Sequence, residues 1–118
     1  MTKIYLAPDA DRRTTKIRVL NDDFRRTING GHVYLTRGVL AHAHVFVDNA
    51  LQCVRAFTDF NDNNDPHGEH DFGAFDLDGV RLFWKIDYYA PDLEHGSEDP
   101  SNAKKTRRVL TILLAEEY

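Results

Sequence analysis

The sequence predicts an α+β fold, an antiparallel sheet of about four strands with two helices packed on one face. Three observations lead to this prediction. Apolar residues recur at helical spacing in two segments, and in other segments they alternate with polar residues as they do in strands. These segments follow one another as helix, strand, helix and then three strands. The Asp78-Gly79 pair between two strand patterns is a strong signal for a two-residue hairpin.

The two predicted helices cover residues 9–29 and about 45–60. In the first helix, apolar side chains at three- and four-residue steps form one face: Ile17, Leu20, Phe24 and Ile28. Its basic side chains are expected to project mostly elsewhere: Arg12, Arg13, Lys16, Arg18, Arg25 and Arg26. Gly30 and Gly31 end this helix, since glycine adopts the left-handed conformation at no side-chain cost. The second helix has a comparable apolar stripe, formed by Val47, Ala50, Leu51, Val54 and Phe57.

The four predicted strands cover residues 32–39, 72–76, 80–89 and 106–115. In the third strand, alternation places one set of mostly apolar side chains on a single face: Val80, Leu82, Trp84, Ile86 and Tyr88. Because that face is otherwise aliphatic, Trp84 is expected in the core. The last strand is apolar on both faces in its middle, which predicts a central position in the sheet.

Length and composition indicate a single domain, residues 1–118, and a cytoplasmic protein. The chain has 118 residues, of which 42% are apolar, and this is enough to bury a core. It contains no run of 18 apolar residues that would predict a membrane span. No apolar run precedes the charges near its start, so no secretory signal is expected. The single cysteine, Cys53, has no partner for an internal disulfide, which suits a reducing compartment.

Charge is distributed unevenly along the chain. Residues 1–37 carry eight basic against four acidic side chains, whereas residues 59–99 carry twelve acidic against two basic, a net charge of −10. Such a segment repels the phosphates of nucleic acid and attracts cations or basic protein surfaces. The basic residues of the first helix could contact phosphates, but they form no recognisable groove-reading motif. Direct nucleic-acid binding is therefore the less favoured alternative, and a protein partner is expected.

Six segments together resemble a small family of uncharacterised proteins found chiefly in alphaproteobacteria. They are NDDFRRT (21–27), LTRGV (35–39), NDPHGEHDFGAF (64–75), FWKIDYY (83–89), GSEDP (96–100) and RVLTILLAEEY (108–118). The resemblance covers about residues 21–118. It implies a single-domain protein, often encoded near plasmid and other mobile-element genes, and it implies no activity. Two positions depart from the family pattern, since His67 stands where tyrosine is usual and Leu113 where methionine is more frequent.

The polar segment 59–71 is a candidate metal site. His70, Glu69 and Asp71 offer the imidazole and carboxylate ligands that suit zinc, manganese or nickel. The main hypothesis includes no cofactor, and the alternative is a bound divalent metal ion. The opposing interpretation is a turn in which Asn and Asp side chains accept nearby backbone N–H bonds, with His70 held by a local carboxylate.

The same cluster supports an enzymatic alternative, a small metal-dependent hydrolase or nuclease that also uses Asp87. Metal-assisted phosphodiester chemistry needs several carboxylates, with a lysine such as Lys85 near the scissile phosphate. The spacing matches no defined nuclease motif, and the chain contains neither a nucleophile motif nor a phosphate-binding glycine loop. Enzymatic activity is therefore the alternative and not the main hypothesis.

The main hypothesis is a non-enzymatic protein-interaction module with an acidic surface. That surface is expected to combine the 59–71 segment with the exposed face of the 80–89 strand, because aromatic side chains anchor partners and charge steers them. The candidate binding residues are Asp59, Asp62, Asp65, Glu69, Asp71, Asp87 and Tyr89. A narrower hypothesis follows from the charge and the resemblance. In it, a mobile-element inhibitor mimics DNA and blocks a host defence nuclease of the restriction or CRISPR type. The sequence predicts neither the partner nor the oligomeric state.

Overall fold

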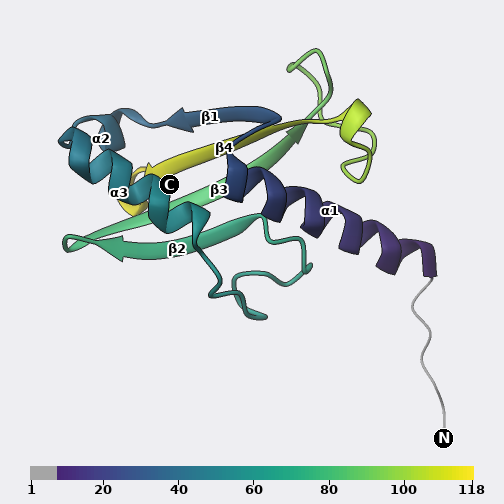
Figure 1. Cartoon of the computed structure of the whole chain (residues 1–118), viewed down its shortest axis with the longest axis horizontal. Coiled ribbons are helices and arrows are strands. Elements are labelled where there is room, and N and C mark those ends of the chain that lie inside the picture. Colours follow the sequence, from purple (N-terminus) through teal and green to yellow (C-terminus); the bar gives the residue numbers. More distant parts are fainter. Residues whose placement is uncertain (1–7) are drawn as a thin grey trace, which may run out of the picture.

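Figure 1 shows the computed structural model, which describes residues 8–118. In chain order, the elements are α1 (Pro8–Thr27), β1 (Gly31–Leu35), α2 (Arg37–Leu40), α3 (His44–Arg55), β2 (Phe72–Leu77), β3 (Val80–Tyr89), η1 (Ala103–Lys105), β4 (Arg107–Leu114) and η2 (Ala115–Glu117). Four strands of this part of the chain form one sheet in the order β1-β4-β3-β2. The predicted α+β class is confirmed, and β4 is central as expected.

Three details of the prediction were wrong. The sheet is not wholly antiparallel, because β1 pairs with β4 in parallel, while β2–β3 and β3–β4 are antiparallel. The first strand ends at Leu35 instead of residue 39, and α2 follows it. The second predicted helix, which is α3, ends at Arg55 instead of residue 60. We attribute the early end of the strand to Glu117 and that of the helix to Arg25, both of which are distant in the sequence.

Glu117 holds the turn that replaces the end of the predicted first strand. Its Oε1 accepts the hydroxyl of Thr36 at 2.6 Å, and its Oε2 accepts the N–H of Gly38 at 3.0 Å. These bonds satisfy a free amide in the first turn of α2, and they hold the pKa of the Glu117 carboxyl below its usual range. Glu117 is about 80 positions away from Thr36 and Gly38 in the chain. The pattern of apolar residues near residue 36 therefore does not reveal this contact.

The core lies between the helices and one face of the sheet. Buried side chains of α3, and Phe57 just after it, pack there against alternate residues of the two central strands: Phe46, Ala50, Val54, Phe57, Leu82, Trp84, Ile86, Leu110, Ile112 and Leu114. The predicted core face of β3 is thus confirmed, and Trp84 is fully buried. Figure 1 shows α3 crossing the sheet on this side, with the first half of α1 extending beyond it. No helix among residues 8–118 has the length and apolar character needed to cross a membrane. The expectation about a secretory signal concerns the chain start, which lies outside the described residues.

The opposite face of the sheet lies away from the helices that build this core, although Val109 and Leu113 on it are buried. We call it the open face. Strand register assigns its residues as His32 and Tyr34 from β1, Phe72, Ala74 and Asp76 from β2, Arg81, Phe83, Lys85, Asp87 and Tyr89 from β3, and Arg107, Val109, Thr111 and Leu113 from β4. The predicted packing of the helices on one face is therefore correct.

Replacing Gly73 with alanine is expected to lower the free energy of unfolding by about 2 kcal/mol, because it overpacks the core. Gly73 lies opposite Trp84 in the β2–β3 pair. A Cβ atom there would overlap the Trp84 ring and lie 2.8 Å from Cζ of Phe57. Gly96→Ala is the matched control, since no heavy atom lies within 4 Å of its added Cβ. Urea unfolding of both variants tests this, and equal midpoints would contradict it.

Candidate functional site

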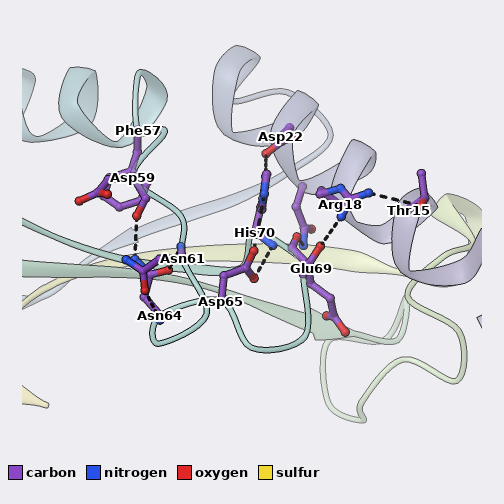
Figure 2. A network of polar contacts seen from close by, with 12 residues as sticks. Thr15, Arg18, Asp22, Phe57, Asp59, Asn61, Asn64, Asp65, Glu69 and His70 are labelled. Carbon is purple, nitrogen blue, oxygen red and sulfur yellow. Dashed lines mark hydrogen bonds and ion pairs between the residues drawn. The ribbon is translucent and has the colours of Figure 1, made fainter. Parts of the chain in front are cut away.

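The 59–71 segment forms a loop that its own side chains stabilise. Asn61 Oδ1 accepts the N–H groups of Asn63 and Asn64 at 2.9 and 3.1 Å. Asn64 Oδ1 accepts the N–H of Asn61 at 2.9 Å, and its Nδ2 donates to the carbonyl of Asp59 at 2.7 Å (Figure 2). The interpretation of this segment as a turn bonded by Asn and Asp side chains is thus confirmed.

His70 attaches this loop to helix α1. Its Nδ1 lies 2.8 Å from Oδ1 of Asp22, to which it donates, and its Nε2 lies 3.5 Å from Oδ2 of Asp65. Its backbone N–H donates to Oδ1 of Asp65 at 3.0 Å, and its ring stacks on Phe60 with centroids 3.7 Å apart. Figure 2 shows the imidazole between the Asp22 and Asp65 carboxylates. The local carboxylate of Asp65 holds His70, as expected. The second carboxylate, that of Asp22, comes from α1 and is supplied only by tertiary folding.

Glu69 belongs to a second polar network under α1. Its Oε1 accepts the hydroxyl of Tyr88 at 2.7 Å, and its carbonyl accepts Nδ2 of Asn21 at 3.0 Å. Asn21 Nδ2 also donates to Tyr88 Oη at 2.7 Å, and Arg108 Nε donates to Asn21 Oδ1 at 2.6 Å. Burial, reinforced by the bond to Glu69, raises the pKa of the Tyr88 hydroxyl far above its usual value. The network is a set of mutually satisfied groups that joins the loop, α1 and the sheet.

The predicted binding residues therefore fall into three groups. Asp59 and Asp62 are exposed in the loop. Asp65 and Glu69 bond within the networks on the helix side of the sheet, and Asp71 is half-buried beside them. The remaining two, Asp87 and Tyr89, lie on the open face. The structure does not bring the seven residues together on one surface.

The acidic side chains of residues 59–99 are also dispersed. Exposed carboxylates occur at three places: the loop (Asp59, Asp62), the β2–β3 hairpin (Asp76, Asp78) and the segment after β3 (Asp92, Glu94, Glu98). The ten residues of β3 span about 33 Å and separate the hairpin from the last group (Figure 1). A net charge of −10 in sequence is thus distributed over separate parts of the molecule.

The open face combines exposed rings with internally paired charges. The Tyr34 side chain is 63% exposed, and Phe83 makes ring contacts with Phe72 and the exposed Tyr118 at centroid distances of 5.4 and 5.5 Å. Lys85 Nζ donates to Asp87 Oδ2 at 2.7 Å, and this bond raises the pKa of the Lys85 amine. Lys85 and Asp87 therefore form an ion pair on the open face.

A pocket of about 200 Å³ lies at one end of the open face. Its lining consists of His32, Tyr34, Tyr89, Leu93 and Val109. Four of these residues come from β1, β3 and β4, and Leu93 reaches the pocket from the loop after β3. Among the predicted binding residues, only Tyr89 lines this pocket.

Residues 35–117 match the model of one protein family, described as a protein of unknown function (DUF3768). The chain belongs to the DUF3768 family. Comparisons with curated proteins and with solved structures gave no match. The DUF3768 match confirms the resemblance to a family of uncharacterised proteins. The matched segment begins at the last residue of β1, so α1 lies outside it. Asn21 and Asp22 of α1 nevertheless bond to Glu69 and His70, and so hold the 59–71 loop of the matched segment in place.

A metal titration is expected to leave the melting temperature of this DUF3768 protein unchanged with magnesium, manganese, zinc or nickel. Glu69 and His70 are each engaged elsewhere, Glu69 by the Tyr88 hydroxyl and His70 by the Asp22 carboxylate. Within residues 8–118, one group of three His, Asp or Glu side chains has ligand atoms within 4.8 Å of one another. It consists of the exposed Asp92, Glu94 and His95, and it contains none of the predicted metal ligands. A rise in melting temperature that His70→Ala abolishes would support the predicted metal site instead.

Replacing Asp71 with asparagine is expected to raise stability at neutral pH. Burial, followed by repulsion from Glu69, raises the pKa of the Asp71 carboxyl above its usual range. A raised folded-state pKa gives a stability contribution that is present below about pH 4 and is lost as pH rises through the folded value. The neutral amide avoids this loss. Thermal melts from pH 3 to pH 8 of Asp71→Asn and of the exposed control Asp62→Asn test this, and an equal response of both would contradict it.

Proposed function

We propose that this DUF3768 protein is a non-enzymatic protein-interaction module that binds its partner through the open face. One observation carries this proposal: the helices that build the core pack on the other face, and on the open face Tyr34 is exposed while Phe83 and Tyr89 are half-buried. An antiparallel sheet that meets water normally presents alternating polar residues. Here β1 and β3 present Tyr34, Phe83 and Tyr89 among the charged residues of β3. Aromatic side chains are enriched at protein-binding surfaces.

The engagement of the candidate catalytic groups supports a non-enzymatic role. Acid–base chemistry requires a side chain that can reach a substrate proton. Glu69 and Tyr88 bond to each other, and His70 lies between two carboxylates. Asp87, the fourth residue of the enzymatic alternative, lies on the opposite face of the sheet and pairs with Lys85. These contacts stabilise the fold and place Asp87 on the other face of the sheet from the remaining candidates.

A narrower form of the proposal keeps the acidic surface as the binding site, in an inhibitor that mimics DNA. The exposed Asp59 and Asp62 support it. We favour the open face over this form for two reasons. Asp65 and Glu69 use their carboxylates within the protein. The exposed acidic groups are also dispersed, whereas a DNA mimic needs closely spaced negative charge along one surface.

Affinity capture with the full chain as bait tests the proposal and separates its two forms. The wild type is compared with Tyr34→Glu on the open face, the double variant Asp59→Asn/Asp62→Asn in the loop, and Val45→Glu. Val45 is the matched control because its side chain is 67% exposed on α3. Each captured protein is purified and its binding is measured directly.

A partner that is lost only with Tyr34→Glu supports the open face. A partner that is lost only with the double loop variant supports the acidic form. Equal binding by all four baits, or no direct binding after purification, would overturn the proposed function.

A further inference from the structure

Arg108 of β4 is a buried cation that lacks an ion-pair partner. It is 5% exposed, and no carboxylate within residues 8–118 forms an ion pair with it. Glu69, the acidic member of its network, is connected to it only through Asn21 and Tyr88. Burial lowers the pKa of the Arg108 guanidinium, and a buried charge is costly unless an opposite charge offsets it. The position of Arg108 therefore favours an anionic ligand.

One nitrogen of the Arg108 guanidinium remains available to such a ligand. Nε donates to Asn21 Oδ1 at 2.6 Å, and Nη2 donates to the carbonyl of Pro100 at 2.6 Å. The third nitrogen, Nη1, bonds to no group in residues 8–118, and it is not among the atoms of this part of the chain that are sealed from solvent without a partner. Its two N–H groups are therefore unused and open to solvent.

Arg108 lines a pocket of about 200 Å³ between α1, η1 and the segment that leads into β1. We call it the Arg108 pocket. Three apolar side chains form part of its wall: Leu20, Phe24 and Ala103. Sites for drug-sized ligands measure roughly 300–1,000 Å³, so the Arg108 pocket suits a smaller molecule with some apolar surface.

Two further donors of the Arg108 pocket are unpaired. The Asn29 side-chain amide and the Gly30 N–H line it, and neither has a hydrogen-bond partner within residues 8–118. Gly30 has a φ of +90°, and a Cβ atom there would meet no heavy atom within 4 Å, so the space beside it is open. A guanidinium, an amide and a backbone N–H together provide the donors that an anion needs.

Negative groups near the Arg108 pocket limit the charge of that anion. Asp23 also lines the pocket. The pocket lies beside the C-terminal end of α1, where a helix carries partial negative charge. Both features disfavour a dianion such as phosphate. A carboxylate carries a single charge and is a common partner of arginine.

We propose that the Arg108 pocket binds a small monocarboxylic acid with a short apolar body. The carboxylate accepts hydrogen bonds from Arg108 Nη1, the Asn29 amide and the Gly30 N–H, and the apolar body packs on Leu20 and Phe24. This site goes beyond a protein interaction through the open face, because α1 and Arg108 lie on the other side of the sheet.

Isothermal titration calorimetry of the full chain with benzoate and benzamide tests the proposal. The two probes share a ring and differ in the charge of their polar group. Benzoate is expected to bind with a dissociation constant of about 1 mM, because so small a ligand gains limited contact area. Benzamide is expected to bind at least about tenfold more weakly. In a ¹H–¹⁵N NMR titration with benzoate, the Gly30 N–H signal is expected to shift.

Variants at exposed positions keep the fold and change the charge of the Arg108 pocket. Asn29→Asp replaces a donor with a carboxylate and is expected to weaken benzoate binding about tenfold or more. Asn49→Asp is the matched control, since it makes the same change at an exposed position of α3 and is expected to leave binding unchanged. Asp23→Asn removes the repulsion and is expected to tighten binding severalfold. Arg108 itself is retained in these variants because it also holds Asn21 and Pro100.

The proposal is overturned if benzoate does not bind at about 10 mM, well above the expected dissociation constant, or if benzamide binds equally well. It is also overturned if Asn29→Asp and Asp23→Asn bind benzoate as the wild type does while circular dichroism shows them folded. Inorganic phosphate tests the class of anion: binding tighter than that of benzoate would exclude a site selective for carboxylates.

Discussion

Replacing Arg25 with alanine is expected to lower the free energy of unfolding by about 4 kcal/mol, since it leaves buried polar groups unpaired. Arg25 is only 1% exposed. Its Nη1 donates to the carbonyls of Val54 and Phe57 at 2.9 and 2.7 Å, and its Nη2 donates to Asp22 at 3.0 Å. Val54 lies in the last turn of α3 and Phe57 follows the helix, so the guanidinium supplies donors to carbonyls at and just beyond the helix terminus. Urea unfolding followed by far-UV circular dichroism measures the loss.

Two further variants define the reason for this effect. Arg26→Ala removes the neighbouring exposed side chain and is expected to change stability by no more than about 0.5 kcal/mol. Arg25→Lys is expected to recover little, because a single amine lacks the planar fork that reaches both carbonyls and Asp22. The Arg25 guanidinium also lies 5.2 Å from the Trp84 ring centroid, a contact that lysine would not reproduce with the same geometry. If Arg25→Ala costs no more than Arg26→Ala, this account of α3 is wrong.

Replacing Asn21 with leucine is expected to destabilise the protein by about 3 kcal/mol, although the two side chains are similar in size. Asn21 is fully buried and bonds at once to Arg108, Tyr88 and the carbonyl of Glu69. Leucine leaves the buried Arg108 guanidinium without its side-chain acceptor, and buried cations without partners are costly. Because the volume is kept, the loss reports hydrogen bonding and not a cavity.

The control for Asn21 is Asp23→Leu, which places the same side chain at an exposed position of α1. Thermal and urea unfolding of both variants are compared at pH 7. We expect a clear loss for Asn21→Leu and a change within about 0.5 kcal/mol for Asp23→Leu. Near-equal stabilities would mean that the network under α1 contributes little and that the loop is held mainly by His70.

Part of this polar network was visible in the sequence. Ile17, Asn21, Phe24 and Ile28 follow steps of four, three and four, so Asn21 lies within the buried stripe of α1. An amide at such a position requires buried partners. The helix pattern did not identify those partners, because Glu69 and Arg108 are far from it in the chain. Arg25 carried no such signal, and the expectation that it projects away from the core was wrong.

Local periodicity and turn chemistry predicted α1 and α3, the hairpin, the buried face of β3 and the central place of β4, whereas α2 was not predicted. The sequence also identified the Asn-rich turn before β2, since those bonds join residues a few positions apart. Three features emerge only from long-range folding: the parallel pairing of β1, the burial of Arg25, and the division of the acidic segment between the helix side, the hairpin and the open face. The pairing of β1 and the burial of Arg25 depend on contacts between residues about 30 or more positions apart, and a charge or hydrophobicity pattern read along one segment contains no information about its distant neighbours.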